Sequence, residues 1–471
     1  MIFSLLPEIF CFIMSLVFII LALKKKEVCS IRKLGLILSF INIILVVLTL
    51  QKEGLYFSEC YKIDLFSQSV KLLIAIGLFF VIFMADDRSE EAIIKSYPEF
   101  LFFLISANLG MFMMSSAVEF ITLFLSLELS SYSMFVLSGF LKNKKVSAEA
   151  GIKYVFIGAI ASAITLYGYS LIYGYYVDTS LLSMKFNSIN LVKDAMLYVG
   201  FVLFLSAFLF KLAILPFSFW APDVYEGSDT TVTTYIATVS KVAGVAVLIR
   251  IFVYFIPIFE SLEKVMLVMA VITMTFGNIL AVQQKDIKRL LAYSSIAQAG
   301  YMMVGILMMN EIGASATLFY VFTYLIMNYT VFLVADQIIK EKGSSSITAL
   351  KGLSQRSPLL SLALLLALLS LGGVPPFVGF TGKWFIFTSA IQKGYLGLVL
   401  IAFLNSVISV YYYLLVARQA YLFEPDDKTP VKTNVFVKIY SYVSIVFIIT
   451  AGFYPTLILN WTGKAIKYLF M

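Results

Sequence analysis

The sequence is dominated by apolar runs of about twenty residues, separated by short polar segments. An α-helix needs roughly 20 apolar residues to cross the hydrocarbon core of a bilayer, so runs of this length predict membrane-spanning helices. We count about fourteen of them, at 3–23, 33–50, 65–85, 98–115, 118–140, 147–173, 195–219, 230–251, 264–283, 289–309, 313–338, 357–390, 394–423 and 434–459. The pattern predicts an all-α polytopic membrane protein.

The composition agrees with this fold class. Of the residues, 61% are hydrophobic and 13% are charged, whereas about a quarter of the residues of a soluble domain are charged. The net charge of +8 comes largely from short loops, which include 24–33, 142–145, 285–289 and 340–356. Basic residues in short loops mark the cytoplasmic side of a membrane protein, so this charge indicates topology and does not indicate a nucleic-acid partner.

The loop charges also orient the chain. An even number of spans places both termini on one side, and a cytoplasmic loop 24–33 makes that side the periplasmic or outer one. The loop 85–95 is then cytoplasmic although it is acidic, but acidic residues have little weight in this rule. We expect a multi-pass protein of the cell inner (plasma) membrane, in which residues 460–471 form a short interfacial helix.

The inventory of metal ligands is small. The chain has no histidine, and its three cysteines, Cys11, Cys29 and Cys60, occur singly. An iron–sulfur cluster requires grouped cysteines, and histidine is the most common metal ligand. We therefore expect no metal site and no cofactor within this chain.

Two of the predicted spans are interrupted by proline. Pro216 has no amide hydrogen, so the carbonyl of Leu212 should lose its helical partner. The stretch LSLGGVPPFVGFTGKW (369–384) should free the carbonyls of Leu371 and Gly372; its helix-breaking residues are Gly372, Gly373, Pro375 and Pro376. Broken spans in corresponding halves are typical of transporters with inverted repeats and a site near mid-membrane, although kinks that serve only packing are the alternative.

This pattern predicts four parts of the chain. They are the N-terminal helices 1–3 (1–97), a first antiporter-like repeat of helices 4–8 (98–251), a second repeat of helices 9–13 (264–423), and helix 14 with the tail (424–471). Each of the two inverted five-helix repeats would contain one broken helix.

Four ionisable residues lie near span centres, namely Glu128, Lys211, Lys241 and Lys383. Such residues cost about 2.5–3.5 kcal/mol each on insertion scales, so they usually have a function. Snorkelling to the membrane surface is the alternative, and it is equally good for Lys153, which lies a turn or two inside its span. We interpret three further residues near span ends as interfacial: Lys71, Asp336 and Arg418.

A lysine and a glutamate can together make a switchable proton site. A dry interior disfavours an isolated ammonium group, whereas a nearby carboxylate stabilises it. Movement of Glu128 relative to Lys211, or a change of hydration, would therefore change whether the lysine holds its proton. Carbonyls freed beside Pro216 would help to keep Lys211 hydrated.

Several stretches together resemble one known family. FKLAILPFSFWAPDVYEG (210–227), IATVSK (236–241), QQKDIKRLLAYSSIAQAGYM (283–302), LSLELSSYSMFVLSGF (125–140) and LSLGGVPPFVGFTGKWFIF (369–387) are similar to motifs of the antiporter-like membrane subunits of respiratory complex I. The shared core covers about residues 98–420. Within that family, the chain looks most like the subunit N branch of bacterial NADH:quinone oxidoreductase.

The resemblance implies roles for the buried residues. Glu128 would tune Lys211, Lys241 would connect the two halves, and Lys383 would be the terminal site of the second half. Lys153 would match a lysine near the cytoplasmic side. NADH, FMN, iron–sulfur clusters and quinone would belong to partner subunits, and the partners would be a neighbouring antiporter-like subunit, small helical subunits and the lipid bilayer.

The chain departs from the family pattern where relatives often carry histidine, because it has Ser218 and Gln298 there. Water or hydroxyl groups would have to replace imidazole in any proton relay at these places.

Three functions fit the sequence. The first is a proton-translocating subunit of a NADH:quinone oxidoreductase, driven by redox chemistry in other subunits. The second is a subunit of a multi-chain Na⁺/H⁺ antiporter with the same core. The third is a membrane scaffold with its buried charges in permanent ion pairs, a reading that does not account for two broken helices.

Overall fold

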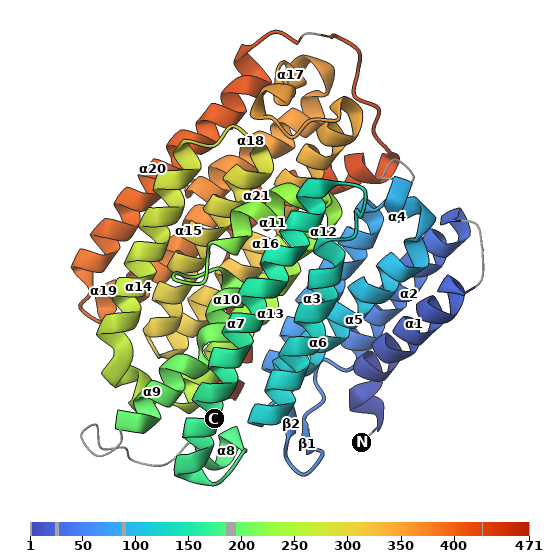
Figure 1. Cartoon of the computed structure of the whole chain (residues 1–471). Coiled ribbons are helices and arrows are strands. Elements are labelled where there is room, and N and C mark those ends of the chain that lie inside the picture. The colour runs from blue at the N-terminus through green and yellow to red at the C-terminus, as the bar shows by residue number, and fades with distance from the viewer. Residues whose placement is uncertain (1, 24–27, 87–90, 185–194, 426, 471) are drawn as a thin grey trace. The chain divides into compact units, whose positions relative to one another are not determined.

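The computed structural model describes residues 2–23, 28–86, 91–184, 195–425 and 427–470 (Figure 1). Within these ranges, 13 helices are long and apolar enough to cross a membrane. A further predicted span, 357–390, is present as two consecutive helices, α18 (Pro358–Gly372) and α19 (Val378–Gln392). The prediction of a helical polytopic membrane protein is confirmed. The loop residues 24–27 and 87–90, which entered the topology prediction, lie outside the described ranges.

The chain divides into two compact units, one formed by residues 1–265 with 464–471 and the other by residues 266–463. The first unit contains η1 (Ile2–Leu5), α1 (Leu6–Ala22), α2 (Val28–Leu48), β1 (Gly54–Tyr56), β2 (Tyr61–Ile63), α3 (Leu65–Met84), α4 (Glu91–Lys95), α5 (Tyr97–Ser116), α6 (Phe120–Ser138), α7 (Lys145–Tyr176), α8 (Leu181–Met184), α9 (Ala195–Phe204), α10 (Ser206–Leu212), α11 (Trp220–Gly227), α12 (Thr230–Tyr235), the π-helical turn Ile236–Ser240 and α13 (Lys241–Tyr254).

Helix α14 (Ile256–Val282) leads from the first unit into the second. The second unit continues with α15 (Ile287–Leu307), α16 (Glu311–Lys342), η3 (Ile347–Leu350), α17 (Leu353–Arg356), α18, α19, α20 (Leu396–Leu422), α21 (Val435–Phe453) and the first half of α22 (Thr456–Phe470). Helix α22 occupies the segment in which we expected a short C-terminal helix.

Polar side chains fix where several of these helices begin. Asp64 precedes α3 and accepts the Ser67 amide at 2.7 Å, while the Ser67 hydroxyl accepts the Asp64 amide at 3.0 Å. Glu119 caps α6 by accepting the Thr122 amide at 2.6 Å. Such caps satisfy amides that the first turn of a helix leaves without partners, which matters most where the chain enters an apolar medium.

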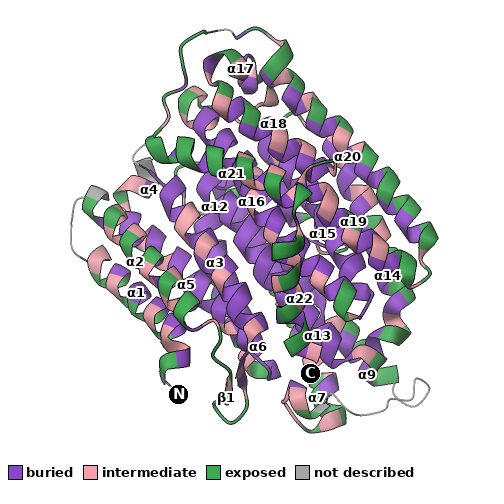
Figure 2. Cartoon of the chain, turned by 180° about the vertical axis from the view of Figure 1, so that it is seen from behind, coloured by how far each residue is buried: buried purple, intermediate pink, exposed green. Residues whose placement is uncertain are grey.

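Burial differs between the helices in a way that fits a bilayer (Figure 2). Every residue in the apolar window of α12–α13 is buried, whereas only 28% of the corresponding window of α2 is buried. The exposed face of α20 is apolar along several turns and includes Leu400, Phe403, Leu404, Val407 and Tyr411. Exposure of such a long apolar face to water is unfavourable, whereas contact with the hydrocarbon chains of lipid is not.

One small β-hairpin departs from the all-helical expectation. Strands β1 and β2 are antiparallel, with Gly54 opposite Ile63, and three residues of left-handed φ, Phe57, Ser58 and Glu59, lie in the connecting turn. The hairpin closes the segment between α2 and α3, and it contributes Tyr61 to the interior of the first unit, where that ring is 4% exposed.

Candidate functional site: buried lysines at interrupted helices

The first predicted helix break is present, and it lies just before Pro216. Helix α10 ends at Leu212, and Ala213 takes a left-handed conformation with φ of 58°. The Ala213 amide donates to the Phe210 carbonyl, and the Ile214 amide donates to the Leu209 carbonyl, both at 2.9 Å. The helix in the predicted span 195–219 therefore ends at residue 212. Proline cannot continue a helix, and the backbone leaves the helical path three residues before Pro216.

Lys211 lies in the last turn of α10 and is 4% exposed. Its ammonium donates a 2.6 Å hydrogen bond to the Ser130 hydroxyl on α6. Glu128, on the same helix, is 7% exposed and accepts a 2.5 Å bond from the Ser162 hydroxyl on α7. Lys211 therefore contacts α6, the helix that carries Glu128. Each of the two side chains bonds to a hydroxyl group, and they do not form a direct ion pair.

A glycine allows the helix that carries Ser130 to approach its neighbour closely. A Cβ atom on Gly110 of α5 would lie 2.6 Å from the Ser130 amide nitrogen. Since that atom is backbone, any larger residue would push α6 away from α5. Gly110 thus helps to place Ser130 where Lys211 can reach it.

Lys241 follows the π-helical turn Ile236–Ser240 and is 1% exposed. A π-turn shifts the backbone hydrogen-bond register by one residue, and such turns occur frequently at functional sites. This turn is a feature that the sequence did not predict. Snorkelling to the membrane surface does not account for Lys241, since its side chain is enclosed by the fold.

The second break frees two carbonyl oxygens, as predicted, and they receive hydrogen bonds from side chains. Helix α18 ends at Gly372, and Gly373 takes φ of 82°, which glycine adopts without strain. The Lys383 ammonium donates to the Leu371 carbonyl at 3.0 Å, to the Gly372 carbonyl at 3.3 Å and to the Ser406 hydroxyl at 3.0 Å. Lys383 is 2% exposed, so the broken turn forms its cation site.

Lys383 has no carboxylate partner among the described residues. Its ammonium lies 4.4 Å from the centre of the Tyr301 ring, a distance at which the ring face attracts a cation. A cavity of about 440 Å³ between α19 and α20 reaches Lys383 and Ser406. The lysine is therefore enclosed by neutral dipoles and an aromatic ring, with a cavity beside it.

Gln298, one of the two positions at which the chain lacks a family histidine, takes part in this site. Its amide nitrogen donates to the Leu371 carbonyl at 3.1 Å and approaches the Tyr413 hydroxyl at 3.5 Å. The Tyr320 hydroxyl donates to the Gln298 side-chain oxygen, and Ser294 shares a hydrogen bond with Tyr413. The glutamine thus joins the lysine-binding carbonyl to a set of hydroxyl groups.

The other such position, Ser218, is different. It is fully buried, and its hydroxyl has no hydrogen-bond partner within the described residues.

Lys153 is separate from the buried lysines. Its side chain is 42% exposed, and its ammonium forms ion pairs with Glu149 and Asp223, each at 2.6 Å. Its environment is therefore that of a surface lysine held by two carboxylates.

Two buried ion pairs between residues far apart in the sequence were not predicted. Lys71, which we expected at the membrane interface, is 0% exposed and lies 2.5 Å from Glu8. The interpretation of Lys71 as interfacial is wrong, because the side chain pairs with Glu8 of α1 inside the first unit. The same interpretation is wrong for Asp336, which is 2% exposed and pairs with Lys340. Arg250 binds both carboxylate oxygens of Asp64 at 3.0 Å. Neither partner is near in sequence, so no local pattern signals these pairs.

Many membrane-spanning helices, two of them broken, with lysines buried at or near the breaks, define a polytopic membrane protein of the ion-translocating class. Residues 117–409 match the family described as NADH:quinone oxidoreductase/Mrp antiporter, TM. The chain is 40% identical to the NADH-quinone oxidoreductase subunit N 2 of Syntrophobacter fumaroxidans, over 99% of both chains. It belongs to this family, within the subunit N branch, and the resemblance seen in the sequence is confirmed.

Solved structures agree with this assignment. The chain superposes on a chain of respiratory complex I from Thermus thermophilus with a TM-score of 0.83 and 29% identity, covering 96% of this chain and 98% of that one. A chain of the Mrp complex from Dietzia sp. DQ12-45-1b gives a TM-score of 0.88 at 19% identity, covering 100% of this chain and 98% of that one. At that identity, the likeness shows the fold alone.

Proposed function

We propose that this chain is a proton-translocating membrane-arm subunit of a NADH:quinone oxidoreductase of the complex I type. The observation that carries the proposal is the set of three lysines, Lys211, Lys241 and Lys383, buried to 4% exposure or less in a member of the subunit N branch. A membrane protein tolerates buried cations where they serve an ion pathway.

The contacts of Lys211 and Lys383 support reversible protonation better than fixed ion pairing. Lys211 donates to a hydroxyl, and Lys383 donates to a hydroxyl and two carbonyls. These neutral acceptors bind an ammonium group without the full charge of a carboxylate, so loss of the proton leaves no unpaired anion behind. A scaffold with permanent ion pairs would place carboxylates there.

In this proposal, the relay runs through Glu128, Lys211, Lys241 and Lys383. Glu128 tunes Lys211 through the shared helix α6 and the hydroxyl groups of Ser130 and Ser162. Lys153, with its two carboxylate partners, supplies protons from the cytoplasmic side. Gln298 and its tyrosine partners take the place of imidazole beside Lys383.

The proposal includes two inverted repeats, 98–251 and 264–423, and matched backbone bonds support it. Ahead of α6 and α15, a capping acid forms the same bridge to a later loop: Glu119 with Ser180, and Asp286 with Ser346. Such a pattern is expected of duplicated folds.

The remaining assignments of the proposal are those that the resemblance to the complex I subunits implies. NADH, FMN, iron–sulfur clusters and quinone would be bound by partner subunits, which would include a neighbouring antiporter-like subunit and small helical subunits. The chain would span the cell inner membrane with both termini on the periplasmic side. The Na⁺/H⁺ antiporter subunit is the second candidate, favoured only by the fold shared with the Mrp complex.

Purification of the intact assembly from native membranes tests the proposal. Flavin and iron–sulfur absorbance that co-purifies with this chain, together with quinone reduction by NADH, is the expected result. Sodium-dependent proton exchange in an assembly that lacks these chromophores would instead establish the antiporter.

A further inference from the structure

Tyr301 lies against the ammonium of Lys383, and other helices fix the position of its ring. The ring is fully buried, and its centre lies 4.4 Å from Lys383 Nζ. The Phe387 ring on α19 packs against it edge-on, with 6.3 Å between the two ring centres. The side-chain nitrogen of Asn278, on α14, donates to the Tyr301 hydroxyl at 3.3 Å. The aromatic contact of Lys383 therefore depends on where a residue of another helix holds the tyrosine.

The side chain of Asn278 is itself held in one orientation. It is fully buried, and its nitrogen also donates to Asn405 Oδ1 at 3.1 Å, while its oxygen accepts the Tyr412 hydroxyl at 3.0 Å. A side-chain amide has two hydrogens to donate and one oxygen that accepts, so every polar atom of this amide has a partner. Rotation of the amide would leave buried polar atoms without partners, which is unfavourable in a low-dielectric interior.

Close packing of α14 on α15 brings Asn278 within reach of the tyrosine. A Cβ atom on Gly277 would lie 2.6 Å from the Ala297 amide nitrogen and 2.7 Å from the Tyr293 carbonyl oxygen. Both of these atoms are backbone, so any larger residue would push the two helices apart. The glycine immediately before Asn278 thus sets the distance across which Asn278 bonds to α15.

The charges around Lys383 give this ring its importance. Among the described residues, Lys383 has no carboxylate partner, and the other charged residues of α15, α16 and α18–α21 lie near the ends of their helices. The titratable side chains that contact Asn278, Gln298 or Lys383 in the described structure are all tyrosines, namely Tyr301, Tyr320, Tyr412 and Tyr413. The face of an aromatic ring attracts an ammonium group but not a neutral amine, so the contact with Tyr301 favours the protonated lysine.

We propose that Asn278 is a positioning residue for Lys383: it holds the Tyr301 ring against the ammonium group, and the ring stabilises the protonated lysine. This inference rests on the proposed function, in which Lys383 binds and releases a proton. The alternative is that the bonds of Asn278 serve only helix packing, in which case they have no effect on the protonation of Lys383.

The pH dependence of proton translocation tests the inference. The ratio of protons translocated to electrons transferred is measured over a range of pH in vesicles that contain the assembled complex. Tyr301→Leu removes the ring, so Lys383 should lose its proton at a lower pH. We expect the alkaline limb of the profile to shift down by about one pH unit, which is a tenfold loss of proton affinity.

A double-mutant cycle separates positioning from packing. Asn278→Leu and Tyr301→Phe break the same hydrogen bond from its two ends. Each should shift the alkaline limb in the same direction as Tyr301→Leu but by less, and the double variant should shift it no further than either single variant. Tyr301→Phe keeps a ring of nearly the same volume, so it tests the inference even if Asn278→Leu does not assemble.

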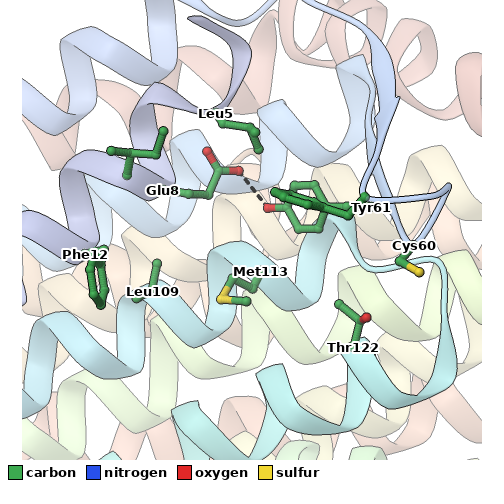
Figure 3. A pocket seen from close by; sticks show the side chains of 10 residues that line it. Leu5, Glu8, Phe12, Cys60, Tyr61, Leu109, Met113 and Thr122 are labelled. Carbon is green, nitrogen blue, oxygen red and sulfur yellow. Dashed lines mark hydrogen bonds between the residues drawn. The ribbon is translucent and has the colours of Figure 1, made fainter. Parts of the chain in front are cut away.

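Tyr61 provides a matched control in the first unit. Its ring is 4% exposed and its centre lies 5.3 Å from Lys71 Nζ, and its hydroxyl donates to Glu8 at 2.7 Å, as Figure 3 shows. Tyr61→Phe therefore removes one hydroxyl from a buried tyrosine beside a lysine, as Tyr301→Phe does. Because Lys71 lies outside the proposed relay, Tyr61→Phe should leave the pH profile unchanged.

Three results would overturn the inference: an unshifted alkaline limb in both Tyr301 variants, additive shifts in the double variant, or an equal shift in Tyr61→Phe. Lys383→Ala separates the inference from the proposed function. Loss of translocation in Lys383→Ala together with unshifted limbs would reject the positioning role alone. Wild-type translocation in Lys383→Ala would reject the relay and, with it, the role of Asn278.

Discussion

Lys383 donates a hydrogen bond to the main-chain carbonyl of Leu371, an oxygen that the interrupted helix α18 leaves without a helical partner. The same carbonyl accepts a bond from Gln298 at 3.1 Å. A helix break, a lysine and a glutamine thus form one site, in which the backbone supplies acceptors for a cation. This arrangement connects a sequence feature, the Gly-Gly-Val-Pro-Pro stretch, to the chemistry proposed for the chain.

Replacement of Gln298 tests whether it substitutes for imidazole at this site. Gln298→Leu removes the donor to the Leu371 carbonyl and leaves the Tyr320 hydroxyl without its acceptor. We expect proton transport to fall about tenfold, in line with about 1.5 kcal/mol for one such bond. Gln298→His, which restores a donor and an acceptor, should recover most of the transport.

Gln68 is a matched control for this prediction. It is also a fully buried glutamine that donates to a backbone carbonyl, that of Thr49 at 3.3 Å, but it lies outside the proposed relay. Gln68→Leu should affect stability without a selective loss of proton transport. Equal losses of transport in both variants would mean that Gln298 only supports packing.

The hydroxyl of Ser130 should matter because Lys211 depends on it. Ser130→Ala removes the 2.6 Å acceptor of the ammonium, and a bond to a charged group contributes about 1.5–3 kcal/mol. We expect proton flux in reconstituted vesicles to drop by about tenfold. Ser126 lies one turn earlier on α6, and within the described part of the chain its hydroxyl bonds only to the Thr122 carbonyl, so Ser126→Ala should retain normal flux. Normal flux in both variants would show that proton transfer does not need the Ser130 hydroxyl.

Lys153 should be less important than Lys211. Its side chain is 42% exposed and its ammonium group is paired with two carboxylates, so water can take over part of the proton transfer at this position. Lys153→Ala is expected to lower proton flux by no more than a few-fold, measured beside Lys211→Ala under the same conditions. A loss as large as that of Lys211→Ala would show that uptake depends on this lysine alone.

The Asp64–Arg250 pair should contribute strongly to stability. Both side chains are at most 4% exposed, and removal of one partner from a buried pair costs about 3–5 kcal/mol. Asp64→Asn should therefore lower the free energy of unfolding by several times more than Glu149→Gln, since Glu149 is 62% exposed in its pair with Lys153. Unfolding of the purified assembly followed by intrinsic fluorescence measures both effects.

The same pair gives a pH dependence with a defined sign. Burial alone would raise the pKa of Asp64, but the Arg250 charge and the Ser67 amide outweigh it and hold the pKa below its ordinary value. The pKa of Asp64 is therefore lower in the folded protein than in the unfolded chain, where it is about 3.9, and the ionised side chain stabilises the fold above that pH. This stabilisation is lost as the pH falls through the pKa of the folded state. The wild type should lose this contribution below about pH 4, and Asp64→Asn should show a flatter acid limb. An identical acid limb in both proteins would contradict the assignment.

The spans and the breaks could be predicted from the sequence because they depend on local properties. Apolar run length sets where helices cross a membrane, and proline chemistry sets which carbonyls lose their partners. The carbonyls of Leu371 and Gly372 are free of helical partners, as predicted, and they bind Lys383. The first break was placed only approximately, since the left-handed residue is Ala213 and the helix ends before Pro216.

The partners of buried charges could not be predicted, because tertiary packing decides them. Glu8 and Lys71 are 63 residues apart, and Asp64 and Arg250 are 186 apart, so no sequence spacing relates them. The π-turn before Lys241 has no local signal either, since IATVS contains no proline or glycine that would alter the register. A lysine such as Lys71 near a span end is therefore ambiguous in sequence between the interface and the core.

In the proposed function, the buried lysines bind and release protons during turnover. The ratio of protons translocated to electrons transferred, measured in vesicles that contain the assembled complex, tests it most directly. We predict that Lys211→Ala and Glu128→Ala insert and assemble normally but lower proton translocation by at least about tenfold, because a lost relay step costs more than about 1.4 kcal/mol. Wild-type proton translocation in both variants would contradict the account.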